Sequence, residues 1–218
     1  MKKFTVIFAL LMFGCFHASA HNNFRDMLKE LMESAHFKYG VEWGYDATFM
    51  DKYHSVYFDP DVGYRIDAEG TKLLLYSNGY ASARIGVELM KHYSATILAG
   101  YCGVKQGRRI FPLTMRATYF IDSYDVSGIM AFIEGGTGVH YESGMDFSDI
   151  NIIVGKCGAG YRLKMSKKSS LDFMASIQLT YDHPGIYNPD IPGYIPDFYV
   201  RRSDDLFGSF NLSCAISF

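Results

Sequence analysis

The last thirteen residues of the chain, 206–218, alternate between apolar and polar side chains. Phe210, Leu212, Cys214, Ile216 and Phe218 are apolar, whereas the residues between them are small or polar. An alternation with a period of two residues predicts a β-strand that has one apolar face and one polar face. The fold of this chain must therefore accommodate a half-apolar strand at its C-terminal end.

The same alternation recurs in seven earlier stretches, so the sequence predicts eight strands. They span about 37–49, 80–89, 93–103, 110–121, 129–141, 152–165, 171–181 and the C-terminal stretch. Each is close to the ~9–11 residues that cross a bilayer at a tilt. The segments 90–92, 122–128 and 166–170 are short, the segments 50–79, 142–151 and 182–205 are longer, and 104–109 is an exception. Short turns at one end and long loops at the other are typical of outer-membrane β-barrels.

The N-terminal segment has the features of an export signal. Lys2 and Lys3 precede an apolar run that is too short to cross a bilayer as a helix, and Ala18-Ser19-Ala20 follows it. This order predicts a signal peptide over residues 1–20. Apolar residues at helical spacing then predict a short periplasmic amphipathic helix over 21–36. The aromatic content of 16% fits rings that line two membrane interfaces.

Two adjoining strands carry a resemblance to a known family. They read FPLTMRATYF over Phe111–Phe120 and FIEGGTGVHY over Phe132–Tyr141. With the signal peptide, the eight strands and the terminal Phe218, residues 37–218 resemble eight-stranded outer-membrane barrels of the OmpA/OmpX type, and most of all the small barrels of Bacteroidetes. The resemblance implies an all-β, antiparallel, up-and-down transmembrane β-barrel in the outer membrane. It also implies that the barrel-assembly machinery reads Phe218, that outer-membrane lipid surrounds the barrel, and that the protein is a monomer.

A soluble lipocalin-like barrel is the main alternative fold, because apolar and polar residues alternate along its strands as well. The polar face of the predicted strands is rich in glycine, including Gly40, Gly44, Gly158 and Gly160. Glycine suits a narrow, filled lumen better than a solvated outer surface. We therefore expect the polar face to point inward.

Charged residues of both signs lie on this polar face. The predicted ion-pair network of the lumen comprises Lys38, Glu42, Arg84, Glu88, Arg116, Glu134, Lys156, Arg162, Lys164 and Asp172. Charges inside a narrow barrel should pair, because an unpaired buried charge is costly. Distances along the chain from the intervening turns predict the pairs Arg116–Glu134 and Lys164–Asp172. A closed lumen follows, and a narrow gated channel is the alternative.

Evidence for catalysis, metals and nucleic acid is sparse in the sequence. Beyond the predicted signal peptide no C-x-x-C or H-x-x-x-H motif occurs, so no cofactor or metal is expected. Loss of Lys2 and Lys3 with the signal peptide would take the net charge from −2 to −4, which does not favour nucleic acid. His54-Ser55 and His92-Tyr93-Ser94 are the two segments that could imitate a lipid A-modifying acyltransferase or deacylase. We expect a non-enzymatic barrel and keep such an enzyme as the alternative.

The two longest connections are the best candidates for contact with an unknown extracellular ligand. Segment 182–205 holds four of the six prolines and carries the aromatic candidates Tyr187, Tyr194, Phe198 and Tyr199. Proline restricts such a loop, so its rings can bind a partner at a lower entropic cost. The sequence therefore predicts a structural or surface-contact role through loops 50–79 and 182–205.

Overall fold

The computed structural model describes residues 35–60, 63–89, 91–105, 108–140, 152–188 and 193–218. The chain divides into two compact units, Met1–Ala35 and His36–Phe218. The predicted signal peptide and almost all of the predicted helix over 21–36 lie outside the described residues. Among the described residues, no helix has the length and apolar composition needed to cross a membrane.

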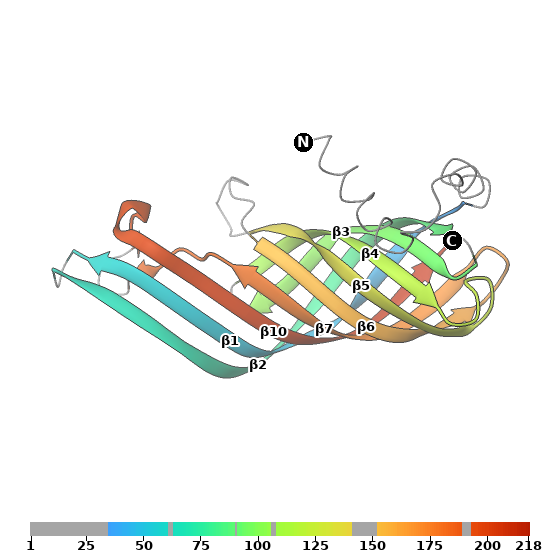
Figure 1. Cartoon of the computed structure of the whole chain (residues 1–218), viewed down its shortest axis with the longest axis horizontal. Coiled ribbons are helices and arrows are strands. Elements are labelled where there is room, and N and C mark those ends of the chain that lie inside the picture. The colour runs from blue at the N-terminus through green and yellow to red at the C-terminus, as the bar shows by residue number, and fades with distance from the viewer. Residues whose placement is uncertain (1–34, 61–62, 90, 106–107, 141–151, 189–192) are drawn as a thin grey trace, which may run out of the picture. The chain divides into compact units, whose positions relative to one another are not determined.

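Eight long antiparallel strands close into a ring, which confirms the predicted fold class (Figure 1). They are β1 (His36–Asp59), β2 (Tyr64–Leu89), β3 (Tyr93–Lys105), β4 (Arg108–Phe120), β5 (Gly128–His140), β6 (Ile152–Lys164), β7 (Ser170–Asp182) and β10 (Val200–Ser217). Each strand pairs with its neighbour in sequence, and β1 pairs with β10 to complete the ring. The connection from β7 to β10 contains a two-stranded sheet, β8 (Tyr187–Asn188) and β9 (Gly193–Tyr194), and a 3₁₀ turn, η1 (Asp197–Tyr199).

Three strands continue beyond the others at one end of the barrel, which we call the hairpin end (Figure 1). β1 and β2 stay paired from His36↔Glu88 to Asp59↔Tyr64, and β10 follows β1 as far as Val200. We call the three-stranded part, residues 50–59, 64–79 and 200–205, the extension. The prediction of loops over 50–79 and 182–205 is therefore wrong in its bounds. Most of 50–79 is a β-hairpin, and β10 already begins at Val200.

The outer surface of the barrel is apolar. Every strand exposes large apolar side chains in the part that belongs to the ring. An example from each strand in turn is Val41, Ile85, Ile97, Leu113, Ile133, Ile153, Ile177 and Leu212, all about half exposed or more. Aromatic pairs lie toward both ends of this face, such as Tyr39 with Phe218 and Tyr101 with Phe111. The polarity is the reverse of that of a soluble domain, where the core is apolar and the surface polar.

The interior is narrow and filled. At Gly100 an added Cβ would lie 2.1 Å from the carbonyl oxygen of Ala81, so the neighbouring strand leaves no room for a side chain. The interior also holds two apolar clusters. The first contains Tyr80, Cys102, Val104, Ile110, Ile152, Val154 and Phe207, and the second contains Phe120, Met130, Phe132, Met174 and Ala215. Side chains rather than solvent therefore fill most of the lumen, as eight strands require.

Candidate functional site: the lumen and the extension

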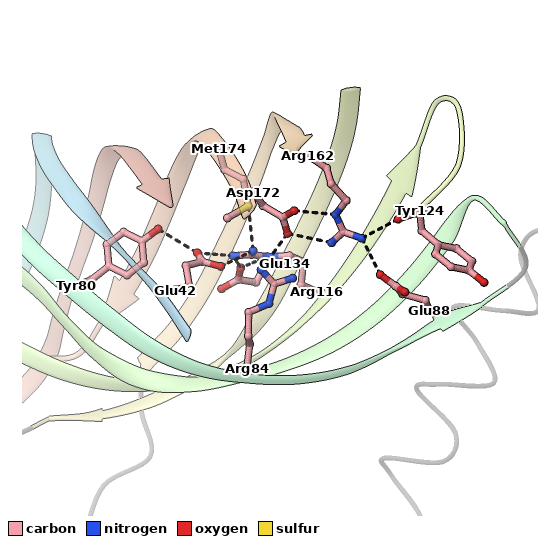
Figure 2. Close-up of polar contacts among 10 residues, drawn as sticks. All are labelled: Glu42, Tyr80, Arg84, Glu88, Arg116, Tyr124, Glu134, Arg162, Asp172 and Met174. Carbon is pink, nitrogen blue, oxygen red and sulfur yellow. Dashed lines mark hydrogen bonds and ion pairs between the residues drawn. The ribbon is translucent and has the colours of Figure 1, made fainter. Parts of the chain in front are cut away.

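Arg116 is the centre of the first lumen ion cluster (Figure 2). Its guanidinium donates to both oxygens of Glu42 at 2.6 and 2.8 Å, and to Glu134 Oε2 at 2.6 and 2.8 Å. The three side chains are at most 5% exposed. Tyr80 and Thr114 donate their hydroxyls to Glu42 and Glu134 at 3.0 and 2.8 Å. Each carboxylate therefore accepts both charged and neutral hydrogen bonds.

Arg162 organises the second cluster in the same way (Figure 2). It donates to both oxygens of Asp172, at 2.7 and 3.0 Å, and to Glu88 at 2.7 Å. Arg84 lies 3.2 Å from Asp172 and adds a second cation to the same carboxylate. The Arg162 guanidinium also lies 4.4 Å from the centre of the Phe120 ring, within the range of a cation–π interaction.

Lys156 completes the charge balance of the two clusters. Its ammonium lies 4.0 Å from Glu134 and 4.7 Å from the centre of the Tyr80 ring. With Lys156, four cations face the four carboxylates described above. A cavity of about 20 Å³ lies beside Lys156, between Glu42, Glu134 and Gln178. It has room for about one water molecule and for no larger ligand.

One predicted pair is in register and the other is not. Arg116 lies opposite Glu134 between β4 and β5, as predicted. The predicted pair Lys164–Asp172 is wrong, because Lys164 lies opposite Ser170 and Arg162 lies opposite Asp172. The β6–β7 turn is closed by a bond from the Met165 N–H to the Ser169 carbonyl, so its centre is one residue earlier than assumed. The partner of Asp172 therefore shifts by two residues, from Lys164 to Arg162, and both of these side chains lie on the same face of β6.

The two remaining lysines of the predicted network, Lys38 and Lys164, are half-buried at the end of the barrel opposite the extension. Lys38 donates to the carbonyl of Lys168 at 3.2 Å across β10. Neither lysine is among the described ion pairs, so they belong to the rim rather than to the buried clusters.

A third polar cluster, at the hairpin end of the lumen, escaped the sequence analysis. Lys105 pairs with Asp51 at 2.8 Å, and Arg108 pairs with Asp205 at 2.8 Å and with Asp182 at 3.6 Å. His140 lies 2.7 Å from Asp182. The sequence could have identified His140 and Asp182. They lie an even number of residues from Glu134 and Asp172 in the same strands, so they point to the same inward face. In the part of the chain that the structure describes, no group of three His, Cys, Asp or Glu side chains could hold a metal ion.

The four aromatic surface candidates lie in the connection between β7 and β10, next to the extension. Tyr187 and Tyr194 occupy partner positions in the β8–β9 sheet. Phe198 and Tyr199 lie in η1; their ring centres are 4.2 Å apart, and Tyr199 contacts Phe58 of β1 at 5.7 Å. Phe198 is 79% exposed. Phe198 thus contacts Tyr199 but leaves most of its ring exposed to solvent.

Contacts between segment 183–199 and β10 fix the base of the extension. His183 Nδ1 lies 2.9 Å from the carbonyl of Ser203, and the Ser203 hydroxyl donates to the Pro184 carbonyl. Tyr181 and Arg202 donate to Asp204. Partial burial raises the pKa of the Asp204 carboxyl, but the bonds from Arg202 and Tyr181 outweigh it, so this pKa lies below its usual value. Asp204 is therefore charged at any ordinary pH.

The two histidine segments considered for catalysis lie far apart. His54 is in the extension, with Nε2 3.2 Å from Asp67 Oδ1, and Ser55 follows it in the same strand. Successive side chains of a strand point to opposite faces, so His54 and Ser55 diverge. His92 is at the other end of the barrel, where Nδ1 lies 3.0 Å from the carbonyl of Phe120. Ser94 is buried in β3.

Comparisons with known proteins give distant similarity to outer-membrane structures. Neisserial surface protein A is 14% identical over 84% of this chain and 99% of its own, with a TM-score of 0.39. The outer membrane protease OmpT from Escherichia coli is 6% identical over 84% of this chain and 96% of its own, also with a TM-score of 0.39. At this level of similarity neither structure assigns an activity to this chain.

Comparisons by sequence give no match. No family model matches the chain, and no curated protein does. The resemblance to OmpA/OmpX-type and Bacteroidetes barrels therefore stays a prediction.

Proposed function

We propose that the protein is an integral outer-membrane β-barrel with a closed lumen, whose work is contact made outside the cell by the extension and by residues 183–199. The observation that carries this proposal is the reversed polarity of the barrel. Apolar side chains cover its outside, and charged side chains at most 9% exposed, such as Arg116, Arg162 and Glu134, fill its inside. A closed barrel satisfies its backbone internally, which is what a lipid environment demands.

The contents of the lumen support closure rather than transport. Two ion clusters, two apolar clusters and a third ion cluster at the hairpin end fill the interior. The cavity of about 20 Å³ at Lys156 is far smaller than a solute of metabolite size. The alternative to a closed lumen is a narrow gated channel. A measurement of ion conductance in planar bilayers distinguishes a closed barrel from such a channel.

Strand direction supports an outward-facing hairpin end. In outer-membrane barrels the short turns face the periplasm and the longer connections face outside. The turns 121–127 and 165–169 lie at the same end as Phe218, whereas the extension lies at the other. The extension and its aromatic residues would therefore meet extracellular partners.

Membrane fractionation combined with heat-modifiable gel migration tests the barrel itself. We expect the protein in the outer-membrane fraction, with faster migration of the unheated form because the barrel resists dodecyl sulfate. Recovery as a soluble periplasmic protein would refute the proposal.

The lipid A-modifying enzyme is tested separately, by mass spectrometry of lipid A from cells with and without the protein. We expect identical acylation, because the His54 and His92 side chains lie in different parts of the barrel and neither contacts a serine hydroxyl in the described bonds. An acyl chain gained or lost in a manner abolished by His54→Ala or His92→Ala would overturn a non-enzymatic role.

A further inference from the structure

Strand β2 has a long edge that pairs with no strand in the part of the chain that the structure describes. It spans 26 residues, yet it pairs with β3 only over the ten residues from Tyr80 to Leu89. Over the other 16, Tyr64–Gly79, it pairs with β1 on one side and with no described strand on the other. In an antiparallel pair about half of the residues turn their N–H and C=O groups away from the partner. Residues 64–79 therefore present a row of backbone donors and acceptors without a strand partner among the described residues, and we call this row the β2 edge.

On the opposite side of the extension, the outer edge of β10 has contacts with the preceding connection. β10 leaves β7 at Asp205↔Asp182, so Val200–Asp204 has β1 on one side and no described strand on the other. There, however, His183 contacts the Ser203 carbonyl, and the Ser203 hydroxyl bonds to Pro184. His183 and Pro184 thus cover the edge of β10 around Ser203. No described backbone or side-chain bond covers the β2 edge in the same way.

The β2 edge must also lie in water. Lipid-exposed sheet edges do not occur within the hydrocarbon region, because their polar groups would stay unsatisfied. The hydrocarbon therefore ends no higher on β2 than Tyr80, the last residue paired with β3. Leu73 and Leu75 lie beyond this limit and are nevertheless 86% and 95% exposed. Two strongly exposed leucines two residues apart, on a strand edge without a described partner, are typical of a contact site.

We propose that the β2 edge binds an extended polypeptide segment of another protein by strand addition, with apolar side chains of that segment packing on Leu73 and Leu75. Only an extended chain offers donors and acceptors at the spacing of a strand edge. The charges along the edge are mixed, with Arg65 and Lys72 against Asp67 and Glu69, so backbone bonds and apolar contact dominate and salt has little effect. This inference rests on the proposed surface-contact function and specifies its partner.

The test uses the full-length barrel in lipid nanodiscs and a defined peptide probe. The probe is an eleven-residue peptide of alternating valine and threonine with two terminal lysines, and its control is the same peptide methylated on every backbone nitrogen. We expect the unmethylated peptide to slow deuterium exchange of amides in Tyr64–Gly79 at least tenfold. The methylated peptide should leave that exchange unchanged. Unaltered exchange in β2, or equal binding of both peptides measured by fluorescence anisotropy, would overturn the proposal.

Matched variants separate this inference from the proposed function on which it rests. The double variant Leu73→Ser and Leu75→Ser should weaken peptide binding about five- to tenfold, because each cross-strand apolar pair adds up to about 1 kcal/mol. The variant Phe198→Ser, which removes a ring that is 79% exposed and lies outside the β2 edge, should bind normally. Binding that depends on Phe198 instead would refute strand addition and keep the surface-contact function. A nanodisc-embedded dimer with slow exchange in β2 before peptide is added would assign the edge to a second copy and also refute it.

Discussion

At the scale of single residues, we expect Arg116 to contribute most to stability, because its one guanidinium binds two buried carboxylates, Glu42 and Glu134. We predict that Arg116→Met lowers the free energy of unfolding by about 3–5 kcal/mol, the usual cost of leaving a buried charge without its partner. The measurement is the urea midpoint of the loss of heat-modifiable migration in lipid vesicles. Lys156, 4.0 Å from Glu134, is too distant to replace the lost bonds.

The control for this prediction removes the charges together. The double variant Arg116→Met and Glu42→Gln should recover much of the lost stability, because it removes one charge of each sign and leaves Glu134 facing Lys156. A double variant as unstable as Arg116→Met alone would show that packing, rather than charge, is what Arg116 supplies. The Arg116 guanidinium also lies 4.4 Å from the centre of the Phe132 ring, so some loss should persist.

The sequence predicted the inward face of these residues better than their partners. Alternation fixes the face of every residue in a strand, so Glu42, Arg84, Glu88, Arg116, Glu134, Arg162 and Asp172 were all assigned correctly to the interior. The partner across a hairpin depends on which residue lies at the centre of the turn. The β6–β7 turn is centred on Lys167 rather than Lys168, so Asp172 lies opposite Arg162 instead of Lys164. Contacts between strands far apart in the ring, such as Arg116 with Glu42, could not be predicted, because they depend on how the barrel closes.

At the scale of the strands, the extension is the largest difference from expectation. Between Phe49 and Tyr64 the alternation of apolar and polar residues is too irregular to mark a strand, although the hairpin does bury a few side chains such as Asp51 and Val56. The register between β1 and β2 is also irregular between Thr48 and Met50, where β2 contributes an extra residue. Strand pairing continues nevertheless, because β1 supplies β2 with a backbone ladder down to Tyr64. The alternation of apolar and polar residues therefore predicted the part of β1 and β2 that belongs to the ring, but not the full length of these strands.

Close packing between strands gives a prediction at the same scale. Gly100 of β3 faces β2, and a Cβ there would lie 2.1 Å from the Ala81 carbonyl oxygen and 2.5 Å from Ser82 Cα. Backbone atoms cannot move aside as a flexible side chain can, so Gly100→Ala should force β2 and β3 apart and destabilise the barrel. The expected result is a lower midpoint of thermal unfolding, followed by the shift from the fast to the slow form on an unheated gel.

Gly155 of β6 supplies the matched control, because an added Cβ meets no atom within 4 Å. Gly155→Ala should be neutral or slightly stabilising, since alanine has less conformational freedom to lose on folding. Equal midpoints for the two alanine variants would contradict the argument that strand contact, rather than the loss of glycine itself, decides the effect.

For the whole molecule, the prediction is that the barrel does not conduct ions steadily. The apolar cluster around Phe207, Ile110 and Ile152 separates the polar cluster at the hairpin end from those around Arg116 and Arg162, and these three apolar side chains are at most 1% exposed. An ion on this path would have to shed its water between apolar side chains and then break paired charges, each step costing several kcal/mol. Purified protein in planar bilayers should therefore show no stable single-channel current. The triple variant Phe207→Ala, Ile110→Ala and Ile152→Ala, which empties this cluster, should show brief openings if it still inserts as a heat-modifiable barrel. A steady ohmic current from the unmodified protein would refute the closed lumen and support the gated channel instead.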